Sequence, residues 1–471
     1  MAKKSKKREA KKSEKTEDRL SDLPDSILIH ILSMLCEDTE DSKEVVRTSV
    51  VSKRWQFLWM SVPVSLEIEI PDDCCFGPPG KWERHVLDYL NSTNRELHYW
   101  RSCHKIRKFS VNCDSSDTER FVKDVHLWVY FASKLANVEH FRLRYEGAYE
   151  FPQFAFKNTS WRKLDIQLGE TLNPSANVNW SGMVSLSLRY MYLTDGVMEK
   201  VLSGCPNLEC LKLYHFVDVH RLEISNVNLR KLIIDNSETD QCDLSLEILA
   251  PYIQNLKILG SCREIYLRNV ASLVNAVLNF EFDCYIEEED TLPRMECTCL
   301  KELLHSVAHV EKLELGPWCI QYLSILELEG WQPPPSSWKF LQLSTTLRQL
   351  DFPGICSFLQ SSSDLETLVV DGYRESRALL LRYTNTDEQI RRFETHDFNC
   401  SFLHLKTIKI LEFSVSLMPL VKYLLKHAVV LEKFIIAAKY KKSDLYYVKR
   451  AQELLSIPRS SPQASVIFSY R

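Results

Sequence analysis

The stretch Leu208-Glu209-Cys210-Leu211-Lys212-Leu213 decides the fold, because its pattern returns along most of the chain. It reads apolar-x-x-apolar-x-apolar. That pattern predicts a short strand whose fourth and sixth side chains point to one face, since side chains alternate along a strand. Copies or partial copies stand at 138–143, 164–166, 186–188, 229–234, 253–258, 310–315, 347–352, 365–370, 405–410 and 431–436.

The early copies are regularly spaced. Their fourth positions are residues 141, 164, 186, 211, 232 and 256, so they recur every 21 to 25 residues. A period in this range is typical of a leucine-rich-repeat solenoid, in which parallel strands stack and the chain returns through helical or irregular segments. One unit cannot cover its own apolar face, so stacking is obligatory. The sequence therefore predicts an α/β fold with Leu211 and Leu213 inside and Lys212 on an outer face that a partner would contact.

The segments around these copies complete the predicted solenoid. The return at 195–202 has apolar residues at helical spacing, and Gly204 is expected to cap that helix. Less regular sequence precedes the first copies, as a capped end requires. The expected elements there and at the carboxyl end are strands at 65–70, 105–111 and 464–468 and helices at 82–97, 119–135, 419–426 and 445–455.

Composition and charge exclude several classes of protein. The chain has 471 residues, 45% hydrophobic content and a formal charge of −4. Residues 1–19 hold nine Lys or Arg and four acids, which leaves −9 on the rest of the chain. An acidic body argues against nucleic-acid binding along the solenoid. No apolar run is long enough for a membrane span, and no apolar segment follows the first lysines, so neither a membrane anchor nor a signal peptide is expected.

The sequence shows neither a cysteine pattern typical of disulfides or zinc nor a known catalytic motif. The fifteen cysteines show no framework spacing, which favours free thiols in a reducing compartment. Cys297-Thr298-Cys299 and Cys74-Cys75 lack a second pair at zinc spacing. No Gly-x-Ser-x-Gly elbow, Walker loop, His-Glu-x-x-His motif or dinucleotide fingerprint appears. We therefore expect no catalytic activity, no metal and no cofactor.

The amino-terminal tail is basic and lacks aromatic residues, so residues 1–17 are expected to be disordered. Two interpretations stay open: a nuclear-import signal or a solvated arm. The expected localisation is the nucleus, the cytoplasm or both. The candidate import residues are Lys3, Lys4, Lys6, Lys7, Arg8, Lys11 and Lys12.

Residues 20–60 predict a small helical module. Pro24 suits the first position of a helix and Asp25 suits its positive end. Apolar residues then recur at helical spacing from Ile27 to Leu35, an acidic loop is expected after Cys36, and a second apolar stretch follows. About 40 residues cannot bury all these groups among themselves. Some must contact either the first repeat or another protein.

Three motifs in this order resemble plant F-box proteins. The module, with Leu23-Pro24-Asp25 and Lys53-Arg54-Trp55, resembles an F-box. The phrase at 202–209 resembles the leucine-rich repeats of the same family, and the segment from 402 to 461 resembles its carboxyl-terminal FBD module. The implied domains are a tail at 1–17, an F-box at 18–62, the repeats at 63–395 and an FBD domain at 396–471.

The resemblance implies an adaptor role. F-box proteins dock on a Skp-type adaptor, which joins them to a cullin and a RING subunit, and they present a protein substrate for ubiquitin transfer. A binding scaffold without ligase coupling is the alternative. The longer segment Cys36–Ser42, where many members turn with a proline, puts the strength of docking in question. The residues that match the docking edge are Leu23, Pro24, Ile27, Leu28, Ile31, Leu32, Val50, Trp55, Leu58 and Trp59.

Overall fold

The structure is a computed structural model. It describes residues 20, 22–39, 42–70, 81–101, 106–113, 118–237, 245–261, 264–281, 292–345, 349–372, 384–395, 401–411, 413, 415–438 and 452–470. The chain divides into two compact units. Unit 1 comprises Met1–Asn112 and Lys123–Arg142, and unit 2 comprises Cys113–Val122 and Leu143–Arg471.

Unit 1 begins with a helical module. Its elements are α1 (Asp25–Thr39), α2 (Ser42–Arg47) and the 3-10 helices η1 (Thr48–Val50) and η2 (Trp55–Ser61). The carbonyl of Pro24 accepts hydrogen bonds from Ile27 N (2.9 Å) and Leu28 N (3.1 Å), so α1 starts where the proline predicts. Of the acidic loop expected at 37–41, residues 37–39 are helical, because α1 extends to Thr39 and no Gly or Pro interrupts it; residues 40 and 41 lie outside the described residues.

The rest of unit 1 alternates strands and helices. Strand β1 (Val64–Glu69) pairs in parallel with β2 (Ile106–Cys113), and α3 (Lys81–Trp100) connects them in sequence. The helix α4 (Val122–Tyr130), the π-helix η5 (Phe131–Leu135) and β3 (Val138–Tyr145) follow. These elements confirm the strands and helices expected between residues 65 and 135.

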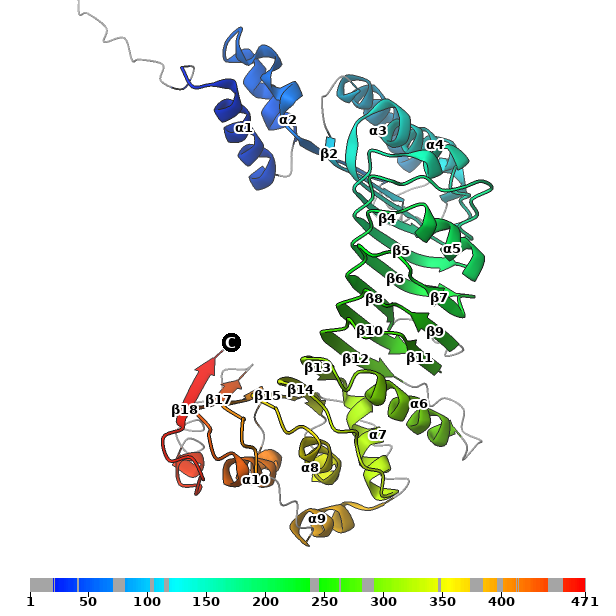
Figure 1. The fold of residues 1–471 in the computed structure, drawn as a ribbon. Coiled ribbons are helices and arrows are strands. Elements are labelled where there is room, and N and C mark those ends of the chain that lie inside the picture. The colour runs from blue at the N-terminus through cyan, green and yellow to red at the C-terminus, as the bar shows by residue number, and fades with distance from the viewer. Residues whose placement is uncertain are drawn as a thin grey trace, which may run out of the picture. The chain divides into compact units, whose positions relative to one another are not determined.

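Unit 2 contains a long parallel sheet in which β4, β5, β6, β8, β10 and β12 lie side by side in chain order (Figure 1). The fourth positions pair with one another from strand to strand: Leu164 with Leu186, Leu186 with Leu211, Leu211 with Leu232 and Leu232 with Leu256. Equivalent positions of the repeat phrase therefore pair with one another across the sheet. Its strands are β4 (Lys163–Leu168), β5 (Ser185–Tyr192), β6 (Cys210–Val217), β8 (Lys231–Asn236), β10 (Asn255–Ser261), β12 (Asn275–Glu281), β13 (Lys312–Leu315), β14 (Phe340–Thr345), β15 (Thr367–Gly372), β16 (Thr407–Leu411), β17 (Lys433–Ala438) and β18 (Ser465–Tyr470).

The inward row is fully buried. Leu211 and Leu213 are 0% exposed, whereas Lys212 between them is partly exposed. The predicted alternation is therefore confirmed, and the apolar core lies on the side of the sheet that carries the fourth and sixth positions.

Helices form several of the returns. α5 (Asp195–Ser203) starts at Thr194, whose side chain accepts a hydrogen bond from Val197 N, and Gly204 is its C-cap as expected. The reason for a glycine differs from the usual one, because Gly204 has a right-handed backbone (φ −79°). A side chain there would meet the Cβ of Val178 at 2.6 Å. The later helices are α6 (Leu292–Ser306), α7 (Pro317–Leu328), α8 (Phe352–Gln360), α9 (Thr386–Thr395) and α10 (Met418–His427).

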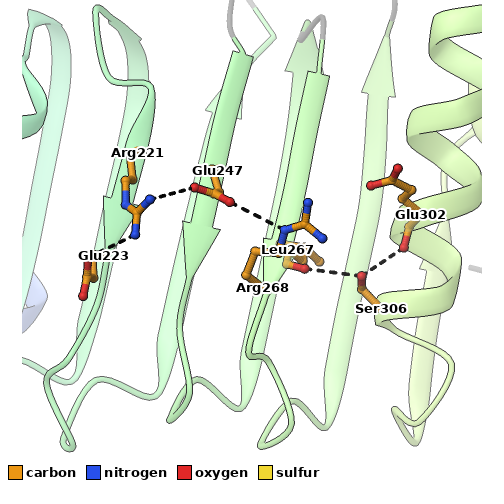
Figure 2. A network of polar contacts seen from close by, with 7 residues as sticks. All are labelled: Arg221, Glu223, Glu247, Leu267, Arg268, Glu302 and Ser306. Atoms are coloured by element: carbon orange, nitrogen blue, oxygen red, sulfur yellow. Dashed lines mark hydrogen bonds and ion pairs between the residues drawn. The ribbon is translucent and has the colours of Figure 1, made fainter.

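Three returns are strands instead of the helical or irregular segments that we expected. β7 (Arg221–Glu223), β9 (Ser245–Leu249) and β11 (Glu264–Arg268) form a second parallel sheet in the order β11-β9-β7. Apolar and polar residues alternate in β9 and β11 with the period of a strand. Figure 2 shows the exposed face of this sheet, where Arg221 pairs with Glu247 at 3.2 Å and Glu247 pairs with Arg268 at 3.5 Å.

Neighbouring helices cover both edges of the second sheet. At the β7 edge, Asp195 Oδ1 of α5 accepts hydrogen bonds from His220 N (2.8 Å) and Arg221 N (3.0 Å). At the β11 edge, Cys299 Sγ of α6 donates to the carbonyl of Ile265 and accepts from its N–H, both at 3.4 Å. Backbone groups that an open edge would present to another strand are thereby engaged.

One predicted strand was wrong. The copy at 347–352 is not a strand in its described part, because Gln349–Asp351 is the 3-10 helix η7 and α8 follows. Pro353 lies in the first turn of α8, where a proline is compatible with a helix and not with a strand ladder. The repeat strand is β14, slightly earlier, with Leu341 and Leu343 both 0% exposed.

At the carboxyl end, β16, β17 and β18 extend the same sheet. Phe434 of β17 pairs with Ile408 of β16 and Val466 of β18. The expected closing strand and the helix at 419–426 are confirmed. Of the helix expected at 445–455, residues 445–451 lie outside the described residues and 452–455 are helical.

Candidate protein-interaction surfaces

The helical module of unit 1 has a filled apolar core. Leu28 and Leu32 of α1 meet Trp55 and Leu58 of η2, and these four residues are 0–8% exposed. Val45 and Val62 complete the cluster. In this structure, four of the ten predicted docking residues hold the module together. Their direct contact with a partner stays a prediction.

A second apolar stripe on α1 faces outward. Ile27 is 44% exposed and Met34 is 52% exposed, with the partly exposed Ile31 between them at helical spacing. We call Ile27, Ile31 and Met34 the outer stripe. Met34 was missed in the sequence analysis, although its distance of seven residues from Ile27 is the signal that finds it.

Other predicted docking residues lie near the surface. Pro24 is exposed and Val50 is 87% exposed, while Leu23 and Trp59 pack partly against the module's core. Phe57, which was not predicted, is 63% exposed. Single exposed apolar residues are ordinary, but a helical stripe of them on a module with a filled core indicates a contact surface.

Arg54 fixes the start of α1 to the later part of the module. Its Nη2 and Nε donate to Asp25 Oδ1 at 2.7 and 3.1 Å, and Nη2 also donates to the carbonyl of Leu23. These bonds join the Leu23-Pro24-Asp25 motif to the Lys53-Arg54-Trp55 motif. The exposed proline and the first turn of α1 are therefore held in one conformation.

Trp59 accounts for part of the apolar surface that the helical module does not bury within itself. Its ring meets Trp100 of α3 edge to face, with centroids 5.5 Å apart and planes at 89°. Trp100 is only 3% exposed. The contact therefore lies within unit 1, and it is of the kind that aromatic pairs favour.

The second candidate surface is a face of β4, β5, β6, β8 and β10. It bears the third and fifth positions of the six-residue phrase and the residue after the phrase, which we number as the seventh position. We call it the recognition face. Arg189 forms its centre: Nε lies 3.1 Å from Asp165 Oδ1, and its guanidinium lies 3.8 Å from the centre of the Tyr214 ring. Burial raises the pKa of the Tyr214 hydroxyl, and the charge of Arg189 opposes that rise. Tyr214 therefore stays neutral and able to donate a hydrogen bond.

The strand ends beside this cluster are conformationally unusual. Tyr190 (φ 51°) and His215 (φ 47°) both have left-handed backbones, and their rings stack with centroids 4.5 Å apart. Such a backbone costs a non-glycine residue on the order of 1–3 kcal/mol and clusters at functional sites. Tyr190 is 39% exposed, so an aromatic surface is available next to the recognition face.

The other sites considered from the sequence are either buried or outside the described residues. Cys297 and Cys299 are buried, and Cys74, Cys75 and the basic tail from Lys3 to Lys12 lie outside the described residues. The described residues include no cluster of three or more side chains suited to a metal ion. Among the helices described, none has the length and apolarity that a bilayer crossing requires.

Comparison with known proteins assigns both parts of the chain. The F-box domain family matches residues 20–66, and the family described as At1g61320/AtMIF1, LRR domain matches residues 100–461. The latter match includes the whole segment at 402–461 that resembles an FBD module. The FBD assignment stays a prediction, as do the predicted domain boundaries.

Similar proteins come from Arabidopsis thaliana. F-box/LRR-repeat protein At3g03360 is 29% identical over 361 residues, which are 75% of this chain and 70% of the relative. F-box/LRR-repeat protein At5g02910 is 31% identical over 359 residues, or 75% and 72% of the two chains. F-box protein At5g03100 is 31% identical over 322 residues, or 66% and 93%. An F-box, a repeat sheet in register and these matches together show that the chain belongs to the plant F-box/leucine-rich-repeat family.

Proposed function

We propose that this protein is the substrate-recognition subunit of an SCF-type cullin–RING ubiquitin ligase. In this role the F-box module binds a Skp-type adaptor, and the repeat sheet holds a protein substrate. The chain itself acts as a receptor without catalytic activity. Its working compartment is the nucleus, the cytoplasm or both.

The outer stripe of α1 carries the proposal. The module's core is complete without Ile27 and Met34, yet both side chains remain about half exposed. The adjoining Pro24 is held by the Arg54 bonds to Asp25 and Leu23. A rigid apolar ridge on a small module supports docking into an apolar groove of another protein, the mode in which helical motifs commonly bind.

Co-purification with the adaptor tests this function. Ile27→Glu combined with Met34→Glu places two charges on the outer stripe without touching the core. We expect the double variant to lose a Skp-type adaptor that the unaltered chain retains, because burying unpaired carboxylates at an interface is costly. Circular dichroism should show unchanged helix content.

A matched control uses exposed leucines elsewhere in unit 1. Leu87 and Leu127 are 57% and 48% exposed, on α3 and α4. Leu87→Glu combined with Leu127→Glu adds the same charge and should keep the adaptor. If the unaltered chain is folded and does not bind the adaptor, the scaffold without ligase coupling replaces the proposed function.

A further inference from the structure

The recognition face carries positive charge on an otherwise acidic body. Its third, fifth and seventh positions include five cations and two aspartates, a formal charge of +3. The residues after the tail carry −9 in total. The cations are Lys163, Arg189, Lys212, Lys231 and Lys257, and the acids are Asp165 and Asp235.

The acids are already engaged and the lysines are not. Asp165 is only 7% exposed and binds Arg189, while Asp235 Oδ1 accepts hydrogen bonds from Ser237 N (3.2 Å) and Ser237 Oγ (2.5 Å). Within the described part of the chain, no side chain of the four lysines forms an ion pair or a hydrogen bond. The positive charge is thus available to a partner.

The hydroxyl of Ser187 is a second indication of a binding site on the recognition face. Ser187 holds the fifth position of β5, between Asp165 of β4 and Lys212 of β6. The residue is 6% exposed, and its Oγ has no hydrogen-bond partner among the residues that the structure describes. A buried polar atom without a partner is uncommon, and an acceptor from a bound molecule would satisfy it.

The spacing of Lys212 and Lys257 indicates which ligand conformation fits the recognition face. Lys212, Ile233 and Lys257 occupy the fifth positions of β6, β8 and β10, so the two lysines are two strand spacings apart. That separation is about 9.6 Å at the usual strand spacing. An extended polyproline II segment repeats every third residue at about 9.3 Å. Carboxylates at every third position would therefore match the two lysines, with an apolar residue between them over Ile233.

We propose that the recognition face binds an acidic, extended peptide segment of a partner protein, with carboxylates on Lys212 and Lys257 and an acceptor on Ser187. The proposal rests on the proposed function, since it names the chemistry of the substrate segment. Nucleic acid fits less well, because the body is acidic and the two aspartates interrupt the cations.

The test measures fluorescence anisotropy of the full chain with a labelled peptide of repeated Glu-Pro-Leu triplets, which places a carboxylate at every third position. We expect saturable binding that weakens with added salt. The same peptide with Gln for Glu should bind little. Lys212→Glu combined with Lys257→Glu should weaken binding about tenfold, because two attractions become repulsions.

The control is charge-matched on the same sheet. Lys409→Glu with Lys433→Glu changes a fifth and a third position on β16 and β17, outside the recognition face, and should alter binding less than about twofold. Lys212→Gln with Lys257→Gln serves if the charge reversal unfolds the protein, and it should also weaken binding. Each preparation is checked for adaptor co-purification, so that a failed docking function is separated from a failed peptide site.

Three outcomes would overturn the proposal. The first is no saturable binding of the Glu peptide by a folded chain that still binds the adaptor. The second is binding that both pairs of variants weaken equally, which indicates net charge alone. The third is tighter, lysine-dependent binding of a single-stranded oligonucleotide of equal charge, which would assign the face to nucleic acid.

Discussion

The position of a residue within a repeat unit decides whether its side chain is buried in the core or exposed on the surface. Leu211 and Lys212 are neighbours in sequence, yet Leu211 is fully buried and Lys212 reaches solvent. Leu211 also pairs laterally with Leu186 and Leu232, so it belongs to a row that crosses several units. Alternate residues of one strand therefore pack in the core or lie at the surface, so the outward residues can change with little loss of stability.

Leu211→Ala should lower the free energy of unfolding by roughly 2–5 kcal/mol, because it leaves a cavity in a close-packed row. Lys212→Ala should change it by less than about 0.5 kcal/mol, as expected for a partly exposed side chain that has no polar partner among the described residues. Thermal denaturation followed by circular dichroism compares the two. A larger loss for Lys212→Ala would mean that the register of the strand is shifted by one residue.

Two glycines of α5, Gly196 inside the helix and Gly204 at its C-cap, make a second matched pair. Gly204→Ala should destabilise the protein, because the new Cβ would lie 2.6 Å from both the Cβ and the carbonyl oxygen of Val178. At Gly196, a new Cβ would meet no atom of the described residues within 4 Å apart from the helix's own backbone, so Gly196→Ala should stabilise the helix by about 0.5–1 kcal/mol. Melting temperatures of the two variants should move in opposite directions. Equal shifts would show that the contact with Val178 relaxes easily.

At the scale of the element, the second sheet shows how a return segment becomes a strand. β9 and β11 have alternating buried and exposed residues, and their exposed charges form the ladder in Figure 2. The ladder continues to α6, where Ser306 Oγ donates to the carbonyls of Leu267 (3.4 Å) and Glu302 (2.9 Å). Exposed pairs of this kind add little stability singly, so the buried alternate residues supply most of it.

Asp195 is the residue that closes the β7 edge. Asp195→Ala removes the acceptor of two backbone N–H groups and should cost about 1 kcal/mol. Glu199→Ala, an exposed acid on the same helix, is the control and should have almost no effect. Hydrogen exchange of the His220 and Arg221 amides is the direct measurement. Unchanged protection of these amides in Asp195→Ala would contradict the proposed edge contact.

The sequence predicted most strands that carry the repeat phrase, and it failed where tertiary context decides the structure. It missed β14, although the inward residues Leu341 and Leu343 are large and aliphatic. The copy at 347–352 matches the phrase, but Pro353 and the buried Asp351 belong to a helical turn. β7 spans only three residues, too few for a period to be read. The outer stripe of α1 was found in part, because helical spacing does not tell which of two apolar stripes faces the core.

At the scale of the whole molecule, the sheet of unit 2 ends with β18. Phe434 and Ile436 of β17 are 0% and 5% exposed, and both pair with residues of β18. A terminal unit of this kind covers the last apolar face of a stack. The carboxyl-terminal segment is therefore structurally part of the repeats.

Ending the chain after residue 451 should remove that cover. We expect binding of an apolar dye and aggregation, since the β17 face would then meet water. Adaptor co-purification should persist, because the F-box module belongs to unit 1. A soluble, monomeric truncation with a cooperative melt would instead show that the last strand is dispensable.

The basic tail is predicted to act as a nuclear-import signal. Deleting residues 2–17 should leave the melting temperature unchanged, because a charged segment without aromatic residues buries little surface. A fluorescent fusion of the deletion should shift from nucleus toward cytoplasm. Unchanged nuclear enrichment would favour the solvated arm, and a fusion with Lys11 and Lys12 kept would locate the residues responsible.

The strand-to-strand pairing of fourth positions also limits which insertions and deletions this fold can tolerate in evolution. Leu186, Leu211 and Leu232 are paired without offset, although the segments between them differ in length. A duplication or loss of one complete turn would therefore leave every remaining turn with the same neighbours. A single-codon deletion inside a strand would invert that strand's two faces. Relatives should consequently differ by whole turns or by loop insertions, and seldom by single residues within β strands.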